Sequence, residues 1–498
     1  MTQTIDHAFR WWARSFPDRV AIALGGDPVS YAALDRWVGA AAAHLVQRGV
    51  RKGDRVVIVA ENSIAWCVVA LASLRIGALA AGLSTRMVRA EIDYIVSDYD
   101  PVVIVHDAAT AEMVGGRDAA SLLAMRSIEA LRDADAPPIL AEVEADDASI
   151  IVTTSGSTAR PKGVVFSHRS IIDSSSWQFL SDPVDRYARL LVAPLSTSAG
   201  IIPLLHTILC GGTAFLEPRF EAEEALRLIV EHRINIVTGA PIFFERMAAV
   251  PAFAAADLSF LRIAHTGGAT VAQALLETWS AKGVLLRQMY GQTECGGTVC
   301  VNPREFALSD PERCGGSMMF TEIAIVDPAG KALPAGVSGE IIVRGPGLMT
   351  CYWNNPEATA KVLAGGWLRT GDIGSVDERG RLKFVDRLKD IIISGGLNIS
   401  AAEVERVLLD IDGIDEAAVI SAPDEKFGEV PMAIVHGASV PQVDMIMDHC
   451  TRELSRFKHP SMIIVETEPL PRLASGKISK PALRAKFAHP TSWPDGVR

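Results

Sequence analysis

Short apolar runs alternate with helical patterns along the first third of the chain, and this alternation narrows the possible folds more than any other feature. Three runs are strand-like, at 55–60, 101–105 and 149–156, and an apolar helical pattern covers 65–76. Strands separated by helices are typical of α/β proteins with largely parallel sheets. We therefore predict an α/β fold.

The most apolar stretch, 65–83, is long enough to raise the alternative of a membrane-spanning helix. Arg75 lies near its centre, and a charged side chain in the middle of a bilayer is costly. Glycine and serine also interrupt the run. The sequence therefore favours a helix buried in a globular domain.

The chain is too long for one hydrophobic core, since 498 residues exceed the size at which a single core stops growing. After the alternating region, segments 338–345 and 381–387 have the pattern of antiparallel strands. We expect residues 1–388 to form a large N-terminal domain of mixed β-sheets packed with helices.

Near residue 388 the pattern changes to a compact βαβ-like tail. Ser400 and Glu403 have the spacing of a capping box, which predicts the start of a helix, and Gly413 follows as a stop signal. About 110 residues suffice for an independent domain. We expect residues 389–498 to form a small, mobile α+β C-terminal domain.

Charge and cysteine content exclude some classes of protein. The formal net charge of -11 argues against a nucleic-acid partner, because binding a phosphate backbone needs a basic face. The seven cysteines form no CxxC pair and their number is odd, which favours a reducing cytoplasm over a disulfide framework. The amino terminus also has no visible secretory signal pattern.

A hydroxyl- and glycine-rich segment follows the third strand-like run. Its candidate phosphate-binding residues are Thr153, Thr154, Ser155, Gly156, Ser157, Thr158 and Lys162. Hydroxyls and glycine amides donate to phosphate oxygens, and the lysine adds a cation. A polar surface loop is the alternative, since these residue types favour loops. A Walker loop is excluded, because no Gly-Lys-Ser/Thr closes the segment.

Four further residues could complete a nucleotide site. Thr293 could donate to a phosphate, and Glu294 could hold Mg²⁺, which prefers one or two carboxylates plus substrate phosphates. Asp372 could accept from ribose hydroxyls, although aspartate beside glycine is also typical of turns. Lys477 lies on a glycine-containing loop near the end of the chain, where a lone lysine is normally solvated.

Taken together in order, these segments resemble the adenylate-forming superfamily, and within it the branch of acyl-CoA synthetases and aryl-CoA ligases. The resemblance covers nearly the whole chain. Its motifs are TSGSTARPKGV, Pro194-Leu195, Gly267-Gly268-Ala269, YGQTE, Gly339-Glu340 to Arg344-Gly345, Tyr352-Trp353-Asn354, TGD, Asp386-Arg387-Leu388-Lys389-Asp390, Gly395-Gly396-Leu397-Asn398 and PRLASGK. It implies an ATP-dependent carboxylic acid–CoA ligase that acts through an acyl-adenylate, with ATP, Mg²⁺ and coenzyme A.

The resemblance also implies roles for the site residues. The 153–163 loop would wrap the β- and γ-phosphates, Thr293 would touch the α-phosphate, and Glu294 would bind Mg²⁺. The nucleoside would be held by Gly268, Ala269, Tyr290, Gly291, Asp372 and Arg387. Lys477 would bridge the substrate carboxylate and the α-phosphate, stabilising the charge that grows during attack.

In this family the small domain rotates after adenylation and presents another face to the same site. By resemblance, Lys389 is the hinge, and Gly395 and Gly396 flank the pantetheine thiol as it enters. Lys458 fits the pattern of the CoA ligases. The attacking sulfur belongs to coenzyme A, so no cysteine of this chain is needed.

The acid pocket is expected at Thr197, Ser198, Ala199, Gly200, Gly267, Gly291, Cys295 and Gly296. Thr197 stands where the family usually has histidine, and no acidic residue occurs between 193 and 203 to pair with an ammonium group. Gly291 stands where acetate-specific relatives have tryptophan. These features predict a deep pocket for an aromatic or branched, largely apolar acid. The alternative is that the serines and threonine only repack a loop.

Three other functions fit parts of the sequence. The acyl-adenylate could pass to an amine, making an amide bond synthetase, because Ser400-Ala401 departs from the aromatic-proline pair common in CoA ligases. Luciferase-like oxidation uses the same scaffold. A non-catalytic nucleotide-binding module is the third, although it would not need both Lys477 and Glu294.

Overall fold

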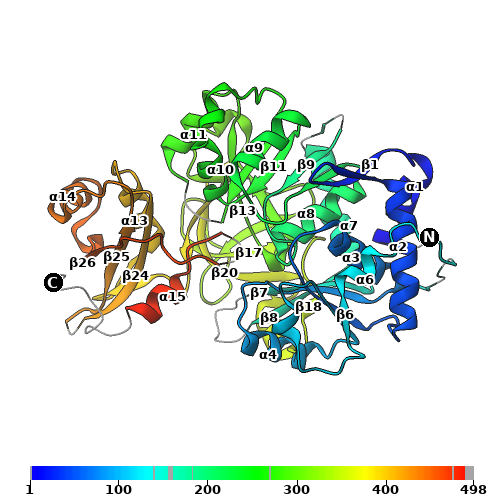
Figure 1. Cartoon of the computed structure of the whole chain (residues 1–498). Coiled ribbons are helices and arrows are strands. Elements are labelled where there is room, and N and C mark those ends of the chain that lie inside the picture. The colour runs from blue at the N-terminus through cyan, green and yellow to red at the C-terminus, as the bar shows by residue number, and fades with distance from the viewer. Residues whose placement is uncertain are drawn as a thin grey trace.

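The computed structural model describes residues 3–137, 139, 141–154, 161–181, 183–184, 186–268, 271–424, 426–473 and 476–487. Within these residues the strands form four sheets. Three sheets belong to a large N-terminal domain and the fourth to a smaller C-terminal domain, coloured orange to red in Figure 1. The predicted mixed α/β architecture with a small second domain is confirmed.

The first two sheets are mainly parallel and carry helices between their strands. One has the order β14-β13-β12-β11-β9-β10-β1-β2 and the other β18-β8-β7-β4-β3-β5-β6. The strands of the first are β1 Val20–Leu24, β2 Asp27–Ser30, β9 Ala188–Leu191, β10 Thr213–Leu216, β11 Ile236–Gly239, β12 Ile263–Gly267, β13 Leu286–Gln292 and β14 Gly297–Val301. Those of the second are β3 Arg55–Val59, β4 Leu79–Gly82, β5 Val103–His106, β6 Leu122–Ala124, β7 Ala148–Thr154, β8 Lys162–Ser167 and β18 Cys351–Tyr352.

The helices of the large domain follow the predicted α/β alternation. The longer ones are α1 Ile5–Ser15, α2 Tyr31–Gln47, α3 Ile64–Ile76, α4 Arg89–Tyr99, α7 His168–Ser181, α8 Ser198–Leu209, α9 Ala222–Glu231, α10 Pro241–Ala248 and α11 Gln273–Ser280. The shorter ones are α5 Ala111–Val114, α6 Met125–Glu129 and α12 Pro356–Val362, with single 3-10 turns η1 Pro251–Ala255, η2 Thr293–Cys295 and η3 Arg304–Phe306.

Helix α3 is the apolar segment whose membrane alternative the sequence raised. All residues of this helix are buried. Nε of Arg75 pairs with Asp6 at 2.8 Å, and Nη2 of the same guanidinium pairs with Asp35. Ser63 caps the start and Gly77, at φ 81°, ends it. It is therefore the predicted core helix, and no helix in the described residues is long and apolar enough to cross a membrane.

The third sheet is antiparallel and joins the two parallel sheets to the small domain. Its order is β15-β21-β20-β17-β16, with β19 beside β20. The bounds are β15 Arg313–Gly315, β16 Glu322–Val326, β17 Gly339–Arg344, β19 Leu363–Ala364, β20 Trp367–Val376 and β21 Leu382–Arg387. The antiparallel strands predicted at 338–345 and 381–387 are thus β17 and β21.

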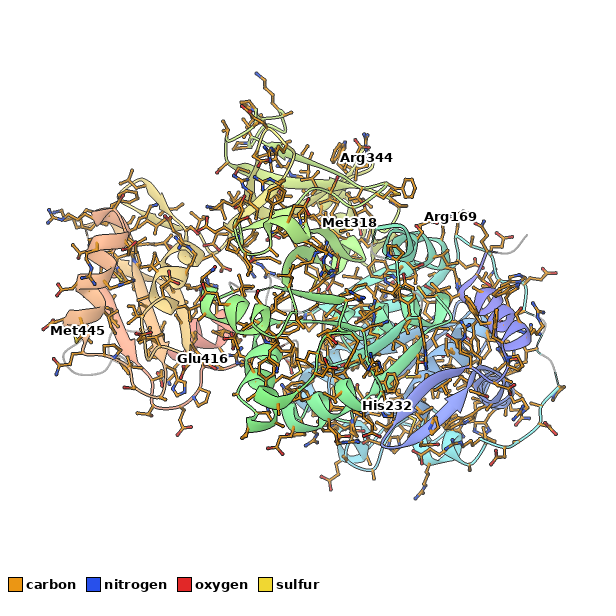
Figure 2. All side chains as sticks on the ribbon, turned by 90° about the horizontal axis from the view of Figure 1, so that it is seen from above. Arg169, His232, Met318, Arg344, Glu416 and Met445 are labelled. Atoms are coloured by element: carbon orange, nitrogen blue, oxygen red, sulfur yellow. The ribbon has the colours of Figure 1, made fainter. Side chains whose placement is uncertain are left out.

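The C-terminal domain has its own sheet, in the order β23-β22-β25-β24 with β26 parallel to β25, and its own apolar core. Its elements are β22 Ile392–Ser394, β23 Leu397–Ile399, α13 Ala401–Leu409, β24 Glu416–Asp424, β25 Gly428–His436, α14 Val443–Glu453, η4 Arg456–Lys458, β26 Met462–Val465 and α15 Lys480–Lys486. Figure 2 shows Met445 on the outer side of this domain and Glu416 on the side nearer the large domain.

The predicted capping box at the start of α13 is only half formed. Oγ of Ser400 accepts from the amide of Glu403 at 3.2 Å, as expected. The Glu403 carboxylate turns instead to Lys458, whose Nζ donates to both oxygens at 2.7 Å. A cation is a stronger partner for a carboxylate than a neutral amide. The Asp386 carboxylate completes the cap, accepting from the amide of Ala402 at 3.0 Å.

Candidate active site

The candidate site lies where β9, β11, β12 and β13 end. These neighbours run parallel, so their carboxyl ends meet at one edge of the sheet. Segments 192–200, 268 and 290–296 follow or end these strands. Of the predicted residues, Ser155, Gly156, Ser157, Thr158 and Ala269 lie outside the described part of the chain.

The hairpin of β7 and β8 brings the flanks of the predicted phosphate loop together. Thr154 pairs with Lys162 across the hairpin, and its Oγ1 donates to the Lys162 carbonyl at 3.4 Å. Oγ1 of Thr153 shares a hydrogen bond of 2.9 Å with the hydroxyl of Tyr99. Thr153, Thr154 and Lys162 therefore stand at the two ends of the 155–160 segment.

Tyr352 links the lysine of this hairpin to the predicted magnesium ligand. Nζ of Lys162 lies 4.8 Å from the centre of the Tyr352 ring, and the Tyr352 hydroxyl donates to Oε1 of Glu294 at 2.8 Å. Burial and the neighbouring Glu294 raise the pKa of Tyr352, so it remains a donor at physiological pH. The Tyr352 hydroxyl thus fixes the orientation of the Glu294 carboxylate.

The amino end of α8 faces the same region. Oγ of Ser198, the first residue of this helix, shares a hydrogen bond of 2.9 Å with Oγ1 of Thr293. Thr197 precedes the helix, but its hydroxyl donates back to the Pro194 carbonyl at 2.8 Å and does not cap the helix amides. The first amides of a helix attract anions. This helix end therefore adds anion-binding capacity beside Thr293.

A buried carboxylate marks the predicted nucleoside end. Asp372 accepts from the Tyr290 hydroxyl at 2.8 Å, and Nε of Arg387 approaches it at 3.7 Å. Burial raises the pKa of Asp372, and the charge of Arg387 opposes that rise. The Tyr290 ring stacks on Phe384 at 6.0 Å. These contacts bring together three predicted residues from β13, β20 and β21.

Lys477 reaches this cluster from the C-terminal domain. A β-carbon built on Gly268 would lie 2.3 Å from Cε of Lys477, so the lysine side chain passes directly over this glycine, whose φ is 83°. Burial and the nearby Arg387 lower the pKa of Lys477 to about 8, while Asp372 acts in the opposite direction. The sequence left open that Lys477 is a solvated loop lysine. In the structure the Lys477 side chain is buried in the candidate site.

A partly buried ion pair holds the segment that carries Lys477. Glu416 accepts from Nη2 of Arg472 and from the amide of Leu470, each at 2.6 Å. Nη1 of Arg472 donates to the Gly476 carbonyl at 2.6 Å, and the amide of Leu473 donates to the Lys477 carbonyl at 2.8 Å. Gly476 in turn approaches the side chains of α10. The orientation of Lys477 therefore depends on Glu416 and Arg472.

At several glycines assigned to the acid pocket, close approach of the backbone leaves no room for a side chain. A β-carbon on Gly291 would lie 1.8 Å from the Gly297 carbonyl oxygen, and one on Gly267 would lie 2.4 Å from that of Met289. Gly200 approaches the Pro194 carbonyl in the same way, and Gly296 has φ 72°. Their small size is explained by strand and helix packing, so it is weaker evidence for a deep pocket than the sequence suggested.

The space around Cys295 is small. A cavity of about 20 Å³ is bordered by Ser174, Cys295, Thr298 and Leu348. That volume is close to what one water molecule occupies. Of the residues predicted to border the acid, Cys295 alone is among those that line this cavity, so the predicted deep pocket stays a prediction.

Gly395, Gly396 and Lys458 are not brought to the cluster around Lys477 and Asp372, whereas Lys389 lies at the edge of this cluster, within range of the charges of Arg387 and Asp372. Gly395 and Gly396 are exposed at the β22–β23 turn with φ of 56° and 85°, values that glycine adopts without strain. Lys389 is also exposed, and Lys458 pairs with Glu403. In this conformation the C-terminal domain presents Lys477 to the site and its paired glycines to solvent.

Sequence reasoning missed three contributors: the hydroxyl of Tyr352, the uncapped amino end of α8, and the Glu416–Arg472 pair. Tyr352 was visible as part of a motif, but its link to Glu294 depends on tertiary packing. The helix end could have been suspected from the Ser-Thr-Ser run before an apolar helical pattern. No local sequence pattern predicts the ion pair between Glu416 and Arg472, because the two residues lie far apart in the chain.

The site residues fit a Mg²⁺ ion held with a nucleotide. Oε1 of Glu294 accepts from the Tyr352 hydroxyl, and the described residues contain no cluster of three or more metal-binding side chains. An ion held by one carboxylate and by substrate phosphates needs no such cluster.

Comparison with known proteins agrees with this geometry. A family model described as AMP-binding enzyme matches residues 9–353, and one described as AMP-binding enzyme C-terminal domain matches 403–477. The chain is 35% identical to the long-chain-fatty-acid–CoA ligase FadD13 of Mycobacterium tuberculosis, covering 92% of this chain and 93% of the relative. It is 36% identical to a feruloyl-CoA synthase of an Amycolatopsis species, covering 95% and 97%.

A similar solved structure is o-succinylbenzoate CoA synthetase (MenE) from Bacillus subtilis with the acyl-adenylate OSB-AMP. Its TM-score is 0.86 at 27% identity, covering 96% of this chain and 97% of that one. The same enzyme has also been solved with ATP and magnesium ion, with a TM-score of 0.86, 27% identity and 97% and 99% coverage. The chain belongs to the AMP-binding enzyme family, as an acid–thiol ligase, and the predicted resemblance is confirmed.

Proposed function

We propose that this protein converts a carboxylic acid to its coenzyme A thioester in two steps, through an acyl-adenylate. The observation that carries the proposal is the position of Lys477, which lies over Gly268 in a cluster with Asp372 and Arg387. A lysine from a separate domain, held at the end of the parallel strands, suits a reaction between two anionic groups. The relatives named above all carry the names of CoA ligases.

In the first step, the carboxylate of the acid attacks the α-phosphorus of ATP and pyrophosphate leaves. Thr153, Thr154 and Lys162 would hold the β- and γ-phosphates together with Ser155, Gly156, Ser157 and Thr158. Thr293 would donate to the α-phosphate, with the amino end of α8 beside it. Bound Mg²⁺, held by Glu294 and the phosphates, would neutralise charge on the leaving pyrophosphate.

The nucleoside would lie between Gly268, Ala269 and Gly291 on one side and Tyr290 on the other. Asp372 and Arg387 would hold the ribose hydroxyls. Lys477 would bridge the incoming carboxylate oxygen and the α-phosphate. Charge grows between these groups in the transition state, and a preorganised cation placed there lowers the barrier most.

In the second step, the thiol of coenzyme A attacks the acyl carbonyl and AMP leaves. We propose that the small domain, 389–498, first rotates about Lys389, withdrawing Lys477 and bringing Gly395 and Gly396 to the adenylate. Ile393, Leu397 and Phe427 surround this turn and are about half exposed in the present conformation. Apolar side chains left in solvent beside the paired glycines are consistent with a face that becomes covered after rotation.

The acid is proposed to be aromatic or branched and largely apolar. Support comes from Thr197 in the position where the family has histidine and from the lack of acidic residues at 193–203. Ser198, Ala199, Gly200, Gly267, Cys295 and Gly296 would border it.

The amide bond synthetase alternative uses the same first step and replaces the thiol by an amine. The exposed Gly395–Gly396 turn and the CoA ligase names of the relatives favour the thiol. We also propose a cytoplasmic location, where ATP and coenzyme A are available, since all seven cysteines are free thiols.

The substrate proposal is tested by kcat/KM for thioester formation across aryl, branched, acetic, long straight-chain and amino acids. Aryl or branched acids should have the highest values, and Thr197→His should narrow the accepted range. A preference for acetate or for any amino acid would overturn the substrate class. Product formation with amines but not with coenzyme A would establish the amide alternative.

A further inference from the structure

A second, larger cavity lies at the opposite edge of the sheet that carries the candidate site. Its volume is about 810 Å³, and Ala188 of β9, Asn235 before β11 and Ile263 of β12 mark its floor. These residues stand at the amino ends of strands whose carboxyl ends carry the site, about 13 Å away along a five-residue strand. Figure 2 labels His232 in this part of the large domain, well away from the C-terminal domain.

The lining is strongly basic. Arg186, Arg233, Arg262 and Arg304 surround the cavity together with His232, in a chain whose net charge is -11. All four arginines are exposed, and none of the described lining residues is acidic; Asp182 and Asp185 lie outside the described residues. Guanidinium groups form planar pairs of hydrogen bonds that match phosphate oxygens.

The walls of the cavity are held in place by hydrogen bonds. Oδ1 of Asn235 accepts from the amide of Ala188 at 3.0 Å, and its Nδ2 donates to the Arg186 carbonyl at 2.5 Å. The Asn235 carbonyl accepts from the amide of Arg262 at 2.9 Å, and Nη1 of Arg304 donates to the Arg262 carbonyl at 3.1 Å. The arginines therefore project from a rigid frame that exists before any ligand binds.

Arg233 adds an independent observation. It has φ 48°, a left-handed backbone conformation at the end of α9 where glycine is the usual and unstrained residue. Its guanidinium lies 4.8 Å from the centre of the Phe260 ring, which also borders the cavity. The stacking on Phe260 therefore holds the Arg233 guanidinium against an aromatic wall of the basic cavity.

We propose that this cavity binds a small molecule carrying two or more phosphate groups, of nucleotide size, separately from the ATP of the reaction. Its volume falls in the range of cofactor pockets, about 300–1,000 Å³. A concave site suits a soluble phosphate compound better than it suits a flat lipid surface. Glu231 lies beside it, but its carboxylate pairs with Arg227 and comes only to 3.8 Å from Nε2 of His232.

The test is the stoichiometry of ADP binding to the whole protein by titration calorimetry at low salt. We expect two sites per wild-type chain, one of which is lost in Arg262→Ser and in Arg233→Gly, with binding there weakened about tenfold or more. Arg246→Ser is the matched control, because this exposed arginine also stacks on a phenylalanine, Phe220, but does not line the cavity. Asp372→Ala should lose the other site and keep this one.

Arg233→Gly separates binding from folding. Glycine relieves the left-handed strain, so its melting temperature should be at least that of wild type while ADP binding at the second site falls. A single ADP site in wild type that survives Arg262→Ser would overturn the proposal, as would two sites retained in both variants. So would binding to phosphatidylglycerol vesicles without any second site for soluble ADP. If Asp372→Ala still binds one ADP, that result supports the proposed binding cavity even if the protein does not catalyse the proposed ligase reaction.

Discussion

Lys477 is the residue whose charge state matters most for the proposed adenylation. Its pKa is lowered to about 8 by burial and by Arg387. The cation is therefore present below pH 8 and is lost as the pH rises through that value. Only the cation can balance the negative charge shared by the carboxylate and the α-phosphate.

The value of kcat/KM for pyrophosphate release should accordingly fall above pH 8, because this parameter reports ionisations of the free enzyme. Lys477→Arg should keep the charge at every accessible pH and lose this alkaline limb, even if its overall rate is lower. A wild-type profile that stays flat between pH 7 and 10 would show that the ionisation of Lys477 does not limit the reaction.

Removing the side chain should separate the two half-reactions. Lys477→Ala is expected to slow formation of the acyl-adenylate about 10²- to 10³-fold, the usual effect of losing one electrostatic contact to a transition state. Conversion of added synthetic acyl-adenylate to thioester should be nearly unchanged. Equal losses in both reactions would contradict the bridging role.

Among the elements, those with a strong period were predictable from the sequence and those defined by distant contacts were not. The runs at 55–60 and 101–105 became β3 and β5, and the helix at 65–76 became α3, since burial on one or all sides imposes a pattern on each. The position of Lys477 over Gly268 could be taken only from resemblance, because these residues are far apart in the chain and no local pattern encodes their contact.

The glycines show that a binding pocket cannot be predicted from the presence of glycine in the sequence alone. Gly291 suggested an open acid pocket, yet its missing side chain is required by the approach of β14. Gly395 and Gly396 suggested room for a cofactor, yet their positive φ values alone favour glycine. In each case a backbone requirement and a ligand requirement predict the same residue, and only the three-dimensional structure separates them.

The segment around Lys477 supplies a prediction at this level. Glu416→Gln should weaken the hold on Arg472 and lower kcat for adenylation about tenfold, through loss of a charged hydrogen bond. The KM for ATP should not change, since Glu416 is not among the residues proposed to hold the nucleotide. Glu466→Gln, which removes an equivalent pair with Lys486 on the same domain, is the control and should have no effect. A changed KM with unchanged kcat would refute a positioning role.

For the molecule as a whole, the arrangement of the two domains suits the proposed adenylation step. Lys477 lies in the site, whereas Gly395 and Gly396 face solvent. The segment between the domains is short: the amide of Leu388 donates to Gly371 of the large domain, and that of Asp390 to Arg387. The proposed rotation would therefore be absorbed by a few backbone dihedrals near Lys389.

Lys389→Pro tests the proposed hinge. Proline fixes φ near -65° and should hold one domain orientation, so adenylation should continue while thioester formation falls steeply. Lys389→Ala removes the side chain but leaves φ free, and it should behave nearly as wild type. If proline only destabilises the small domain, both half-reactions and the melting temperature fall together. A well-folded Lys389→Pro protein that makes thioester at the wild-type rate would exclude rotation about this residue.

The most direct measurement is the identity of the products formed from ATP, with and without coenzyme A, in the presence of an accepted acid and Mg²⁺. We expect pyrophosphate and enzyme-bound acyl-adenylate without coenzyme A, close to one equivalent per chain, and repeated release of AMP and acyl-CoA when coenzyme A is added. Omitting the acid or Mg²⁺ should abolish both. Release of ADP and phosphate instead of AMP and pyrophosphate would contradict the proposed reaction.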